Sequence, residues 1–191
     1  LEVLKEKQKA IESGELWKEK GFDPIEVILP TRTFEDQMDM QVGDIQVIFK
    51  AIPTHSPDTI AAWLPKQDTI LAGDALEDPL PLVIPQLLNA QTQLYGLGEL
   101  LSRPVHRIYP SHGEIETISN GGYTRELVVG NIAYMSRLLA KQPDPDFLGL
   151  SAESFIAEEL KRGELHWWEP YREAHRYNAQ RARDFYGEYH A

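Results

Sequence analysis

The sequence contains no cysteine, and this absence excludes several kinds of site at once. Without thiols the chain has no disulfide framework, no thiolate-bound zinc and no cysteine nucleophile. Imidazole nitrogens and carboxylate oxygens are the strong metal ligands that remain. Such a donor set fits a catalytic, hydrolytic metal site better than a closed structural zinc site, because structural zinc is usually bound by cysteine.

Long apolar runs are also absent. No run in the sequence approaches the roughly 18 residues that a membrane-spanning helix needs. Residues 1–20 are charged throughout, unlike the apolar stretch of a signal peptide. We therefore expect a soluble, cytoplasmic protein without a membrane partner, unless an upstream segment carries a signal.

Basic residues are scarce. The chain has 19 Lys and Arg against 30 Asp and Glu, which gives a formal net charge of −11. Affinity for nucleic acids comes mostly from Lys and Arg side chains that displace counterions from phosphates. Because an acidic chain is repelled by a phosphate backbone, we expect a small-molecule substrate and no nucleic-acid partner.

At 191 residues the chain can bury a core as one domain with a helical appendage. Apolar periodicity and turn residues predict a mixed α/β chain. Helices are expected at residues 2–20, 86–102, 123–141, 151–162 and 170–189. Strands are expected at residues 26–29, 45–52, 59–64, 69–72 and 105–109. Residues 31–40 and the proline-rich residues 76–85 are expected as loops, and Gly43-Asp44 and residues 65–68 as turns.

Three of the expected strands lead into a residue type that binds divalent metals. The motifs are Thr54-His55-Ser56-Pro57, Ala72-Gly73-Asp74 and Pro110-Ser111-His112-Gly113. Gly73 would let the backbone turn sharply so that Asp74 faces inward. Since ligands from different strands converge at strand ends, His55, Asp74 and His112 are the candidate metal ligands.

In order and spacing these motifs resemble the later motifs of metallo-β-lactamase-fold hydrolases, over roughly residues 26–114. The resemblance implies that His55 binds one metal, that Asp74 bridges two metals and that His112 binds the other. It also implies an α/β (α+β) fold like the second half of an αβ/βα sandwich, with added C-terminal helices. The expected organisation is an N-terminal helix at 1–22, the half-sandwich at 23–142 and a C-terminal helical extension at 143–191.

The sequence departs from the family pattern at the family's strongest signature. A His-x-His-x-Asp-His run, which supplies four of the ligands, occurs nowhere in the chain, and no histidine precedes His55. The chain also begins at Leu1 and not at methionine. We therefore expect the C-terminal portion of a larger protein, a fragment that is inactive alone.

The resemblance implies a hydrolase in which metal-bound water attacks an ester, lactone, amide, thioester or phosphoester. Zinc is the expected metal, with one or two ions in the intact protein, and iron or manganese are alternatives because His and carboxylate ligands discriminate weakly among them. A second hypothesis is a non-catalytic interaction or structural module that has lost the first metal-binding motif. A third is that the missing ligands arrive from a complementing N-terminal half or from a homo-oligomer.

Other polar residues have alternative interpretations. Asp58 either accepts a hydrogen bond from a metal-binding histidine and fixes its tautomer, or closes its own turn. His106 is interpreted as a structural residue on a strand, and Glu158 and Glu159 as part of a solvated face. The aromatic residues after residue 166 predict either packing onto the sandwich or a docking surface.

Overall fold

The structure is a computed structural model that describes Lys9, Ser13 and residues 30–82, 90–104, 106–140 and 146–190. The chain divides into two compact units, residues 1–35 and residues 36–191. Apart from Lys9 and Ser13, the helix expected at residues 2–20 and the strand expected at 26–29 lie outside the described residues. All of the candidate site residues belong to the second unit.

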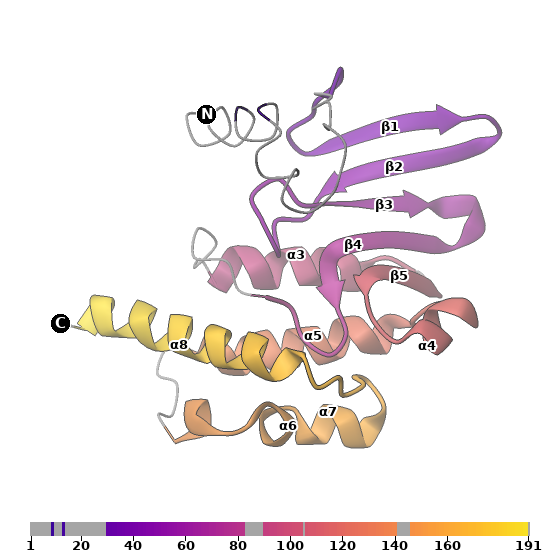
Figure 1. The fold of residues 1–191 in the computed structure, drawn as a ribbon. Helices are drawn as coiled ribbons and strands as arrows, with labels where there is room; N and C mark the ends of the chain where they lie inside the picture. Colours follow the sequence, from indigo (N-terminus) through magenta and orange to yellow (C-terminus); the bar gives the residue numbers. More distant parts are fainter. Residues whose placement is uncertain are drawn as a thin grey trace. The chain divides into compact units, whose positions relative to one another are not determined.

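A five-stranded sheet is central to the second unit, with the strands in the order β1-β2-β3-β4-β5 (Figure 1). The strands are β1 Gln37–Val42, β2 Ile45–Ala51, β3 Ile60–Leu64, β4 Thr69–Glu77 and β5 Arg107–His112. The strands β1 to β4 pair antiparallel with their successive neighbours, whereas β5 pairs parallel to β4. The parallel pair brings the carboxyl ends of β4 and β5 to the same edge of the sheet. The predicted α/β (α+β) fold class is confirmed.

The loop predicted at residues 31–40 is wrong in its second half, because β1 begins at Gln37. Only Met38 and Met40 on this strand are partly buried, so the apolar alternation is too weak to reveal it. The turn predicted at Gly43-Asp44 is confirmed: Val42 pairs with Ile45, and Gly43 has a φ of +59°. Between β3 and β4, a 3₁₀ turn at Pro65–Gln67 makes the tight connection that was expected.

Strand β4 is longer than predicted and continues through Asp74 to Glu77. Its pairing with β5 shifts register at Gly73, where φ is +55°. This glycine therefore allows an irregularity within the strand, and the strand does not end there. Strand β5 likewise passes through Pro110, where a break was expected. Pro110 is tolerated because β5 is an edge strand and the ladder is already irregular at this point.

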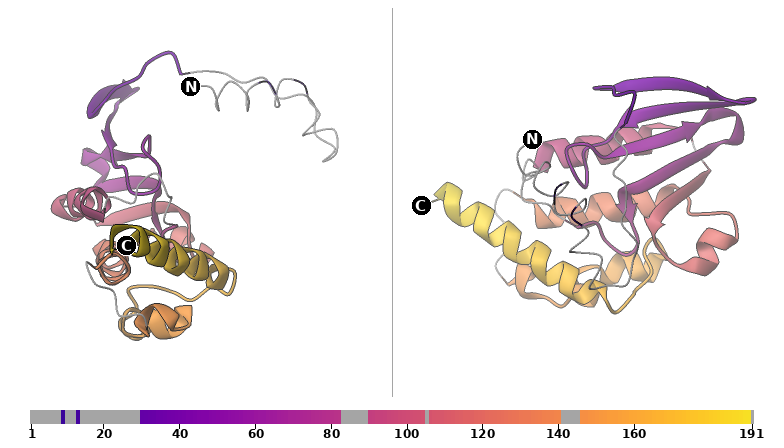
Figure 2. Two further views of the ribbon diagram at one scale, coloured as in Figure 1. Left: turned by 90° about the vertical axis from the view of Figure 1, so that its left-hand side faces the viewer. Right: turned by 45° about the horizontal axis from the view of Figure 1, so that its top comes forward.

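Two helices cover one face of the sheet, α3 Ala90–Ser102 and α5 Arg125–Leu138 (Figure 2). They contact each other, and α5 also packs against β4. The core between these elements is aliphatic: Ile52, Ile70, Leu76, Leu97, Leu100, Ile108, Leu127 and Leu138 are all buried. Helix α5 begins after Tyr123, because this residue pairs with Ile108 of β5 instead of joining the helix. A short helix, α4 Ile115–Ser119, follows β5.

Short helices and one long helix complete the chain: η3 Phe147–Gly149, α6 Ala152–Phe155, α7 Ala157–Arg162 and α8 Tyr171–His190. The single helix expected at 151–162 is divided at Ile156. The Ser151 hydroxyl caps the first part, because it accepts from the Ser154 amide at 3.2 Å. Helix α8 contacts α5 and α6. No helix in the described part of the chain is both long enough and apolar enough to cross a membrane.

The interpretation of Glu159 as a solvated residue is wrong. Only 1% of this residue is exposed. Its carboxylate accepts two hydrogen bonds from the Arg137 guanidinium, at 2.9 and 2.7 Å. Burial raises the pKa of Glu159, but the bonds and charge of Arg137 outweigh that effect and the pKa is lowered. This ion pair joins α7 to α5.

Candidate metal centre

His55 lies in the loop between β2 and β3, and polar contacts hold this loop in place. The Thr54 hydroxyl donates to the carbonyl of Ala75 in β4 at 2.9 Å. On the other side, Gly96 of α3 leaves room for Thr54, since a Cβ at this glycine would lie 2.9 Å from Thr54 Cγ2. The loop bearing His55 is therefore attached to the strand that bears Asp74.

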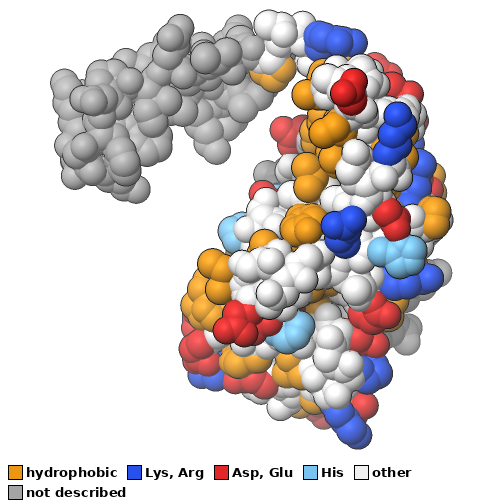
Figure 3. Space-filling model, turned by 90° about the vertical axis from the view of Figure 1, so that its right-hand side faces the viewer, with side chains coloured by type: hydrophobic (Ala, Val, Ile, Leu, Met, Phe, Trp, Pro, Cys, Tyr) orange, Lys and Arg blue, Asp and Glu red, His pale blue; other side chains and the backbone are white. Residues whose placement is uncertain are grey.

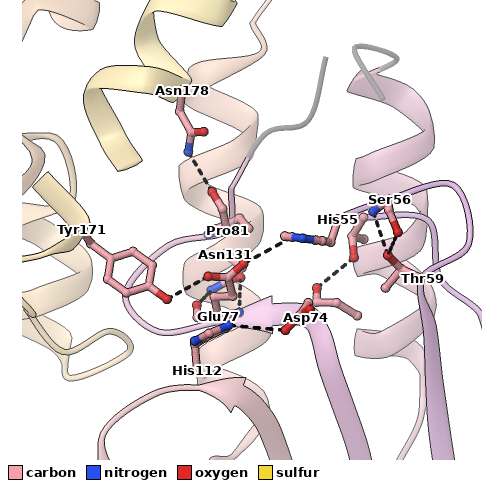
Figure 4. A network of polar contacts seen from close by, with 12 residues as sticks. His55, Ser56, Thr59, Asp74, Glu77, Pro81, His112, Asn131, Tyr171 and Asn178 are labelled. Atoms are coloured by element: carbon pink, nitrogen blue, oxygen red, sulfur yellow. Dashed lines mark hydrogen bonds and ion pairs between the residues drawn. The ribbon is translucent and has the colours of Figure 1, made fainter. Parts of the chain in front are cut away.

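The other two candidate ligands lie together, Asp74 within the second half of β4 and His112 at the carboxyl end of β5. The Nε2 atom of His112 is 3.6 Å from Oδ1 of Asp74, and both side chains are about half exposed (Figure 4). Two ligand atoms on one tetrahedral metal ion, each about 2.0–2.2 Å from it, lie roughly 3.4 Å apart. The observed separation of 3.6 Å is close to this value.

His55 faces a different carboxylate, that of Glu77. Its Nδ1 lies 3.4 Å from Glu77 Oε1, yet this buried nitrogen has no hydrogen bond of favourable geometry (Figure 4). Glu77 is 5% exposed and accepts a hydrogen bond from the Tyr171 hydroxyl of α8 at 2.8 Å. Burial and then the charge of Glu77 raise the pKa of Tyr171, so this hydroxyl stays protonated and remains a donor. A buried imidazole nitrogen without a good partner, beside a carboxylate, is a donor set that suits a divalent metal.

The backbone of Glu77 is fixed as firmly as its side chain. The amide of Asn131 in α5 donates to the Glu77 carbonyl at 3.0 Å and accepts from the Glu77 N–H at 3.4 Å. Sequence reasoning missed Glu77, although the acidic residues in Asp74-Ala75-Leu76-Glu77-Asp78, directly after an apolar strand, were a usable signal. The side-chain alternation of β4 was obscured by the irregularity at Gly73.

Asp78 begins the turn after β4 and is buried. Its carboxylate accepts from the Tyr123 hydroxyl at 2.8 Å, the His166 N–H at 2.7 Å and the His166 ring Nδ1 at 2.8 Å. Burial raises the pKa of Asp78, and the hydrogen bonds oppose that shift. His166, which is far from these strands in the sequence, therefore lies close to the end of β4.

The remaining histidine and aspartate candidates have local partners. Asp58 accepts a hydrogen bond of 2.6 Å from the Ser56 hydroxyl within its own loop, and its effect on a metal-binding histidine stays a prediction. His106 is exposed and lies before β5, where its ring contacts Asp68, so its placement on a strand was wrong. On the face drawn in Figure 3, acidic and basic side chains are interspersed and histidines reach the surface at separate places.

Of the four histidine–carboxylate pairs among the described residues, two contain candidate metal ligands, His112 with Asp74 and His55 with Glu77. Within the described ranges no group of three or more His, Asp or Glu side chains is arranged to hold a metal ion. Each pair provides two donors, which is fewer than the three protein ligands of a typical catalytic zinc site.

No protein-family model matches the chain, and no match was found among curated proteins. Solved structures do match. A metallo-beta-lactamase family protein from Thermus thermophilus is 19% identical, with a TM-score of 0.52, covering 92% of this chain and 54% of that one. An archaeal metallo-beta-lactamase superfamily protein from Sulfolobus tokodaii is 15% identical, with a TM-score of 0.48, covering 96% and 64% respectively.

A metallo-beta-lactamase from Pontibacter korlensis is 19% identical, with a TM-score of 0.43, covering 63% of this chain and 53% of that one. The chain thus spans about half the length of several of the solved structures that it matches. The match to the Thermus thermophilus protein, together with the order of the three motifs along β2 to β5, shows that this chain has part of the metallo-β-lactamase fold.

Proposed function

We propose that the chain is part of a metal-dependent hydrolase. The observation that carries this proposal is the 3.6 Å separation between His112 Nε2 and Asp74 Oδ1 at the ends of two parallel neighbouring strands. In the proposed site these two residues bind one divalent metal, and His55 contributes a ligand to a second. Zinc is the first candidate, with iron or manganese as alternatives.

A bound divalent metal would supply a water whose pKa is lowered towards about 7 and would polarise a carbonyl or phosphoryl oxygen. The chain's own residues position the donors. Tyr171 and Asn131 hold Glu77, and the Glu77 carboxylate lies 3.4 Å from His55 Nδ1. Thr54 ties the same loop to β4. The proposed substrates are small esters, lactones, amides, thioesters or phosphoesters.

The proposal requires further ligands, because each pair alone provides only two donors. We propose that they come from a complementing N-terminal half, on the same chain or another, or from a second copy of this chain. The upstream coding sequence provides the decisive observation. A His-x-His-x-Asp-His run within roughly a hundred residues before Leu1 would supply the usual four ligands on this fold. If no such run is found there, the missing ligands must come from another chain.

A second candidate function is a non-catalytic interaction or structural module. The observation that favours it is that the described residues contain no group of three metal-binding side chains. In that case the His112–Asp74 pair is an ordinary polar contact, and zinc does not bind there more tightly than at other histidine–carboxylate pairs.

Zinc binding by the 191-residue chain tests the proposal against the module. We expect calorimetry to show a weak zinc site that H112A or D74N weakens at least tenfold, because each variant removes one of two ligands. H106A is the matched control, since His106 forms the same kind of pair with Asp68 at the opposite end of β5. The proposed site is contradicted when H112A does not weaken zinc binding, or when H106A and H112A weaken it equally.

A further inference from the structure

A pocket of about 360 Å³ opens beside the candidate metal centre. It is lined by Asp78, Gly113, Glu114, Ile115, His166, Trp167 and Trp168. Asp78 directly follows β4, and Gly113 and Glu114 directly follow His112 of β5. The backbone N–H of Asp78 also donates to the His112 carbonyl at 3.3 Å. The pocket therefore begins at the strand ends that carry the candidate ligands, and its size falls within the range of small-molecule sites.

The Asp, Glu, Lys and Arg side chains in the lining of this pocket are all acidic. Its lining contains the carboxylates of Asp78 and Glu114, and no Lys or Arg among the described residues lines it. The hydrogen-bonding capacity of Asp78 is used by Tyr123 and His166. Glu114 is different, because its side chain is exposed and accepts from the Thr117 hydroxyl at 2.7 Å. Glu114 is thus the carboxylate that a ligand can reach.

Large apolar side chains form the rest of the wall. Ile115 is 76% exposed and Trp168 is 57% exposed, so both side chains are open to a ligand. The ring of Trp168 is held against Tyr171, with the centroids 5.6 Å apart. An indole and a carboxylate that line one pocket attract a cation, the first through the ring quadrupole and the second through its charge. A neutral apolar ligand would use only the indole, and an anion would be repelled.

We propose that this pocket binds a positively charged organic group, a primary or quaternary ammonium, carried by the substrate. The ammonium lies against Trp168 and Glu114, and the rest of the molecule extends towards the end of β5. That this molecule is the hydrolysed substrate rests on the proposed function. Binding of the ammonium in the pocket does not, because none of the lining residues is a candidate metal ligand.

The test compares choline with its neutral isostere 3,3-dimethyl-1-butanol, by calorimetry on the metal-free 191-residue chain at low salt. We expect choline to bind at least about tenfold more tightly, which corresponds to one charge-dependent contact of ordinary strength. E114Q should remove most of that preference and leave the isostere unchanged. W168A should weaken both ligands, and W168F should retain choline binding because it keeps an aromatic face.

E116Q is the matched control, since Glu116 is a nearby exposed acid outside the pocket lining. It should bind choline as the parent chain does, and circular dichroism verifies that each variant is folded. Equal affinity for the two ligands, no choline binding, or the same loss in E116Q as in E114Q would overturn the proposal. Zinc titration of the same samples tests the proposed metal centre independently, because choline binding needs no metal.

Discussion

The hydroxyl of Tyr123 donates a 2.8 Å hydrogen bond to the carboxylate of Asp78, the residue that directly follows β4. The same hydroxyl oxygen accepts from the N–H of Glu114 at 2.6 Å. Gly113 lies so close that a Cβ there would be 2.6 Å from this hydroxyl. One phenol therefore ties the turn after β4 to the turn after β5, and both turns border the candidate metal centre and the ammonium pocket.

Replacing Tyr123 with Phe should lower the free energy of unfolding by roughly 1–3 kcal/mol, because it leaves buried hydrogen-bonding groups without their partner. Burial and the charge of Asp78 raise the pKa of Tyr123, so the lost donor is a protonated hydroxyl at every ordinary pH. Urea unfolding measures the change. Y177F is the control, since Tyr177 is 37% exposed and its ring lies beside Arg181. A Y123F chain as stable as Y177F would show that the phenol does not join the turns.

Two glycines of α3 should respond in opposite ways to the same substitution. Gly98 has nothing within 4 Å of an added Cβ, so G98A should stabilise the chain by about 0.5–1 kcal/mol through helix propensity. A Cβ at Gly96 would meet Thr54 Cγ2 at 2.9 Å, so G96A must displace the loop that carries His55 and should destabilise by about 1 kcal/mol or more. Thermal unfolding of the pair measures both. The packing argument fails if G96A is as stable as G98A.

Sequence patterns predicted β2 to β5 and the longer helices α3, α5 and α8, but neither the short helix α4 nor the division of residues 151–162 into α6 and α7. They predicted the ends of β4 and β5 less well. The irregularity at Gly73 and the edge position of Pro110 allow both strands to continue through residues that usually end a strand. Local propensity cannot reveal either effect, because both depend on which strand lies alongside.

The candidate site was predictable only in part for a similar reason. The short motifs identified His55, Asp74 and His112, and the structure pairs two of them. The role of Glu77 depends on Tyr171, 94 residues away, and that of Asp78 on His166, 88 residues away. Contacts over such separations leave no local pattern in a single sequence.

The buried Glu159–Arg137 pair should contribute measurably to stability. E159Q is expected to cost roughly 2–3 kcal/mol, less than a fully buried pair, because Arg137 keeps some contact with solvent. Since the folded-state pKa of Glu159 is lowered from 4.5, its contribution is present above about pH 4.5 and is lost as the pH falls through the folded value. Urea unfolding at pH 7 and at lower pH measures both effects. E158Q, at an exposed neighbour, should change stability by less than about 0.5 kcal/mol.

His175 should make the chain less stable in mild acid. It is 2% exposed, contacts the Tyr134 hydroxyl at 3.2 Å and lies 4.7 Å from the Phe155 ring. Burial, and then the charge of Arg183, lower its pKa, while a bond to Leu150 and the charge of Glu153 oppose this. The unfolded chain then binds more protons than the folded chain below about pH 6.5, so stability must fall as the pH falls through that range.

The slope that one such histidine adds is at most about 1.4 kcal/mol per pH unit. We therefore expect urea midpoints measured between pH 8 and pH 5 to fall, and H175F to flatten that decline even though it loses the bond to Tyr134. H106N is the matched control, because His106 is exposed and away from the core, and it should keep the parent slope. If H175F keeps the pH dependence of the parent chain, or if H106N loses it, a group other than His175 causes the loss of stability in acid. Because His175 lies where α8 meets α5 and α6, its protonation acts on the layer that supplies Tyr171 to Glu77.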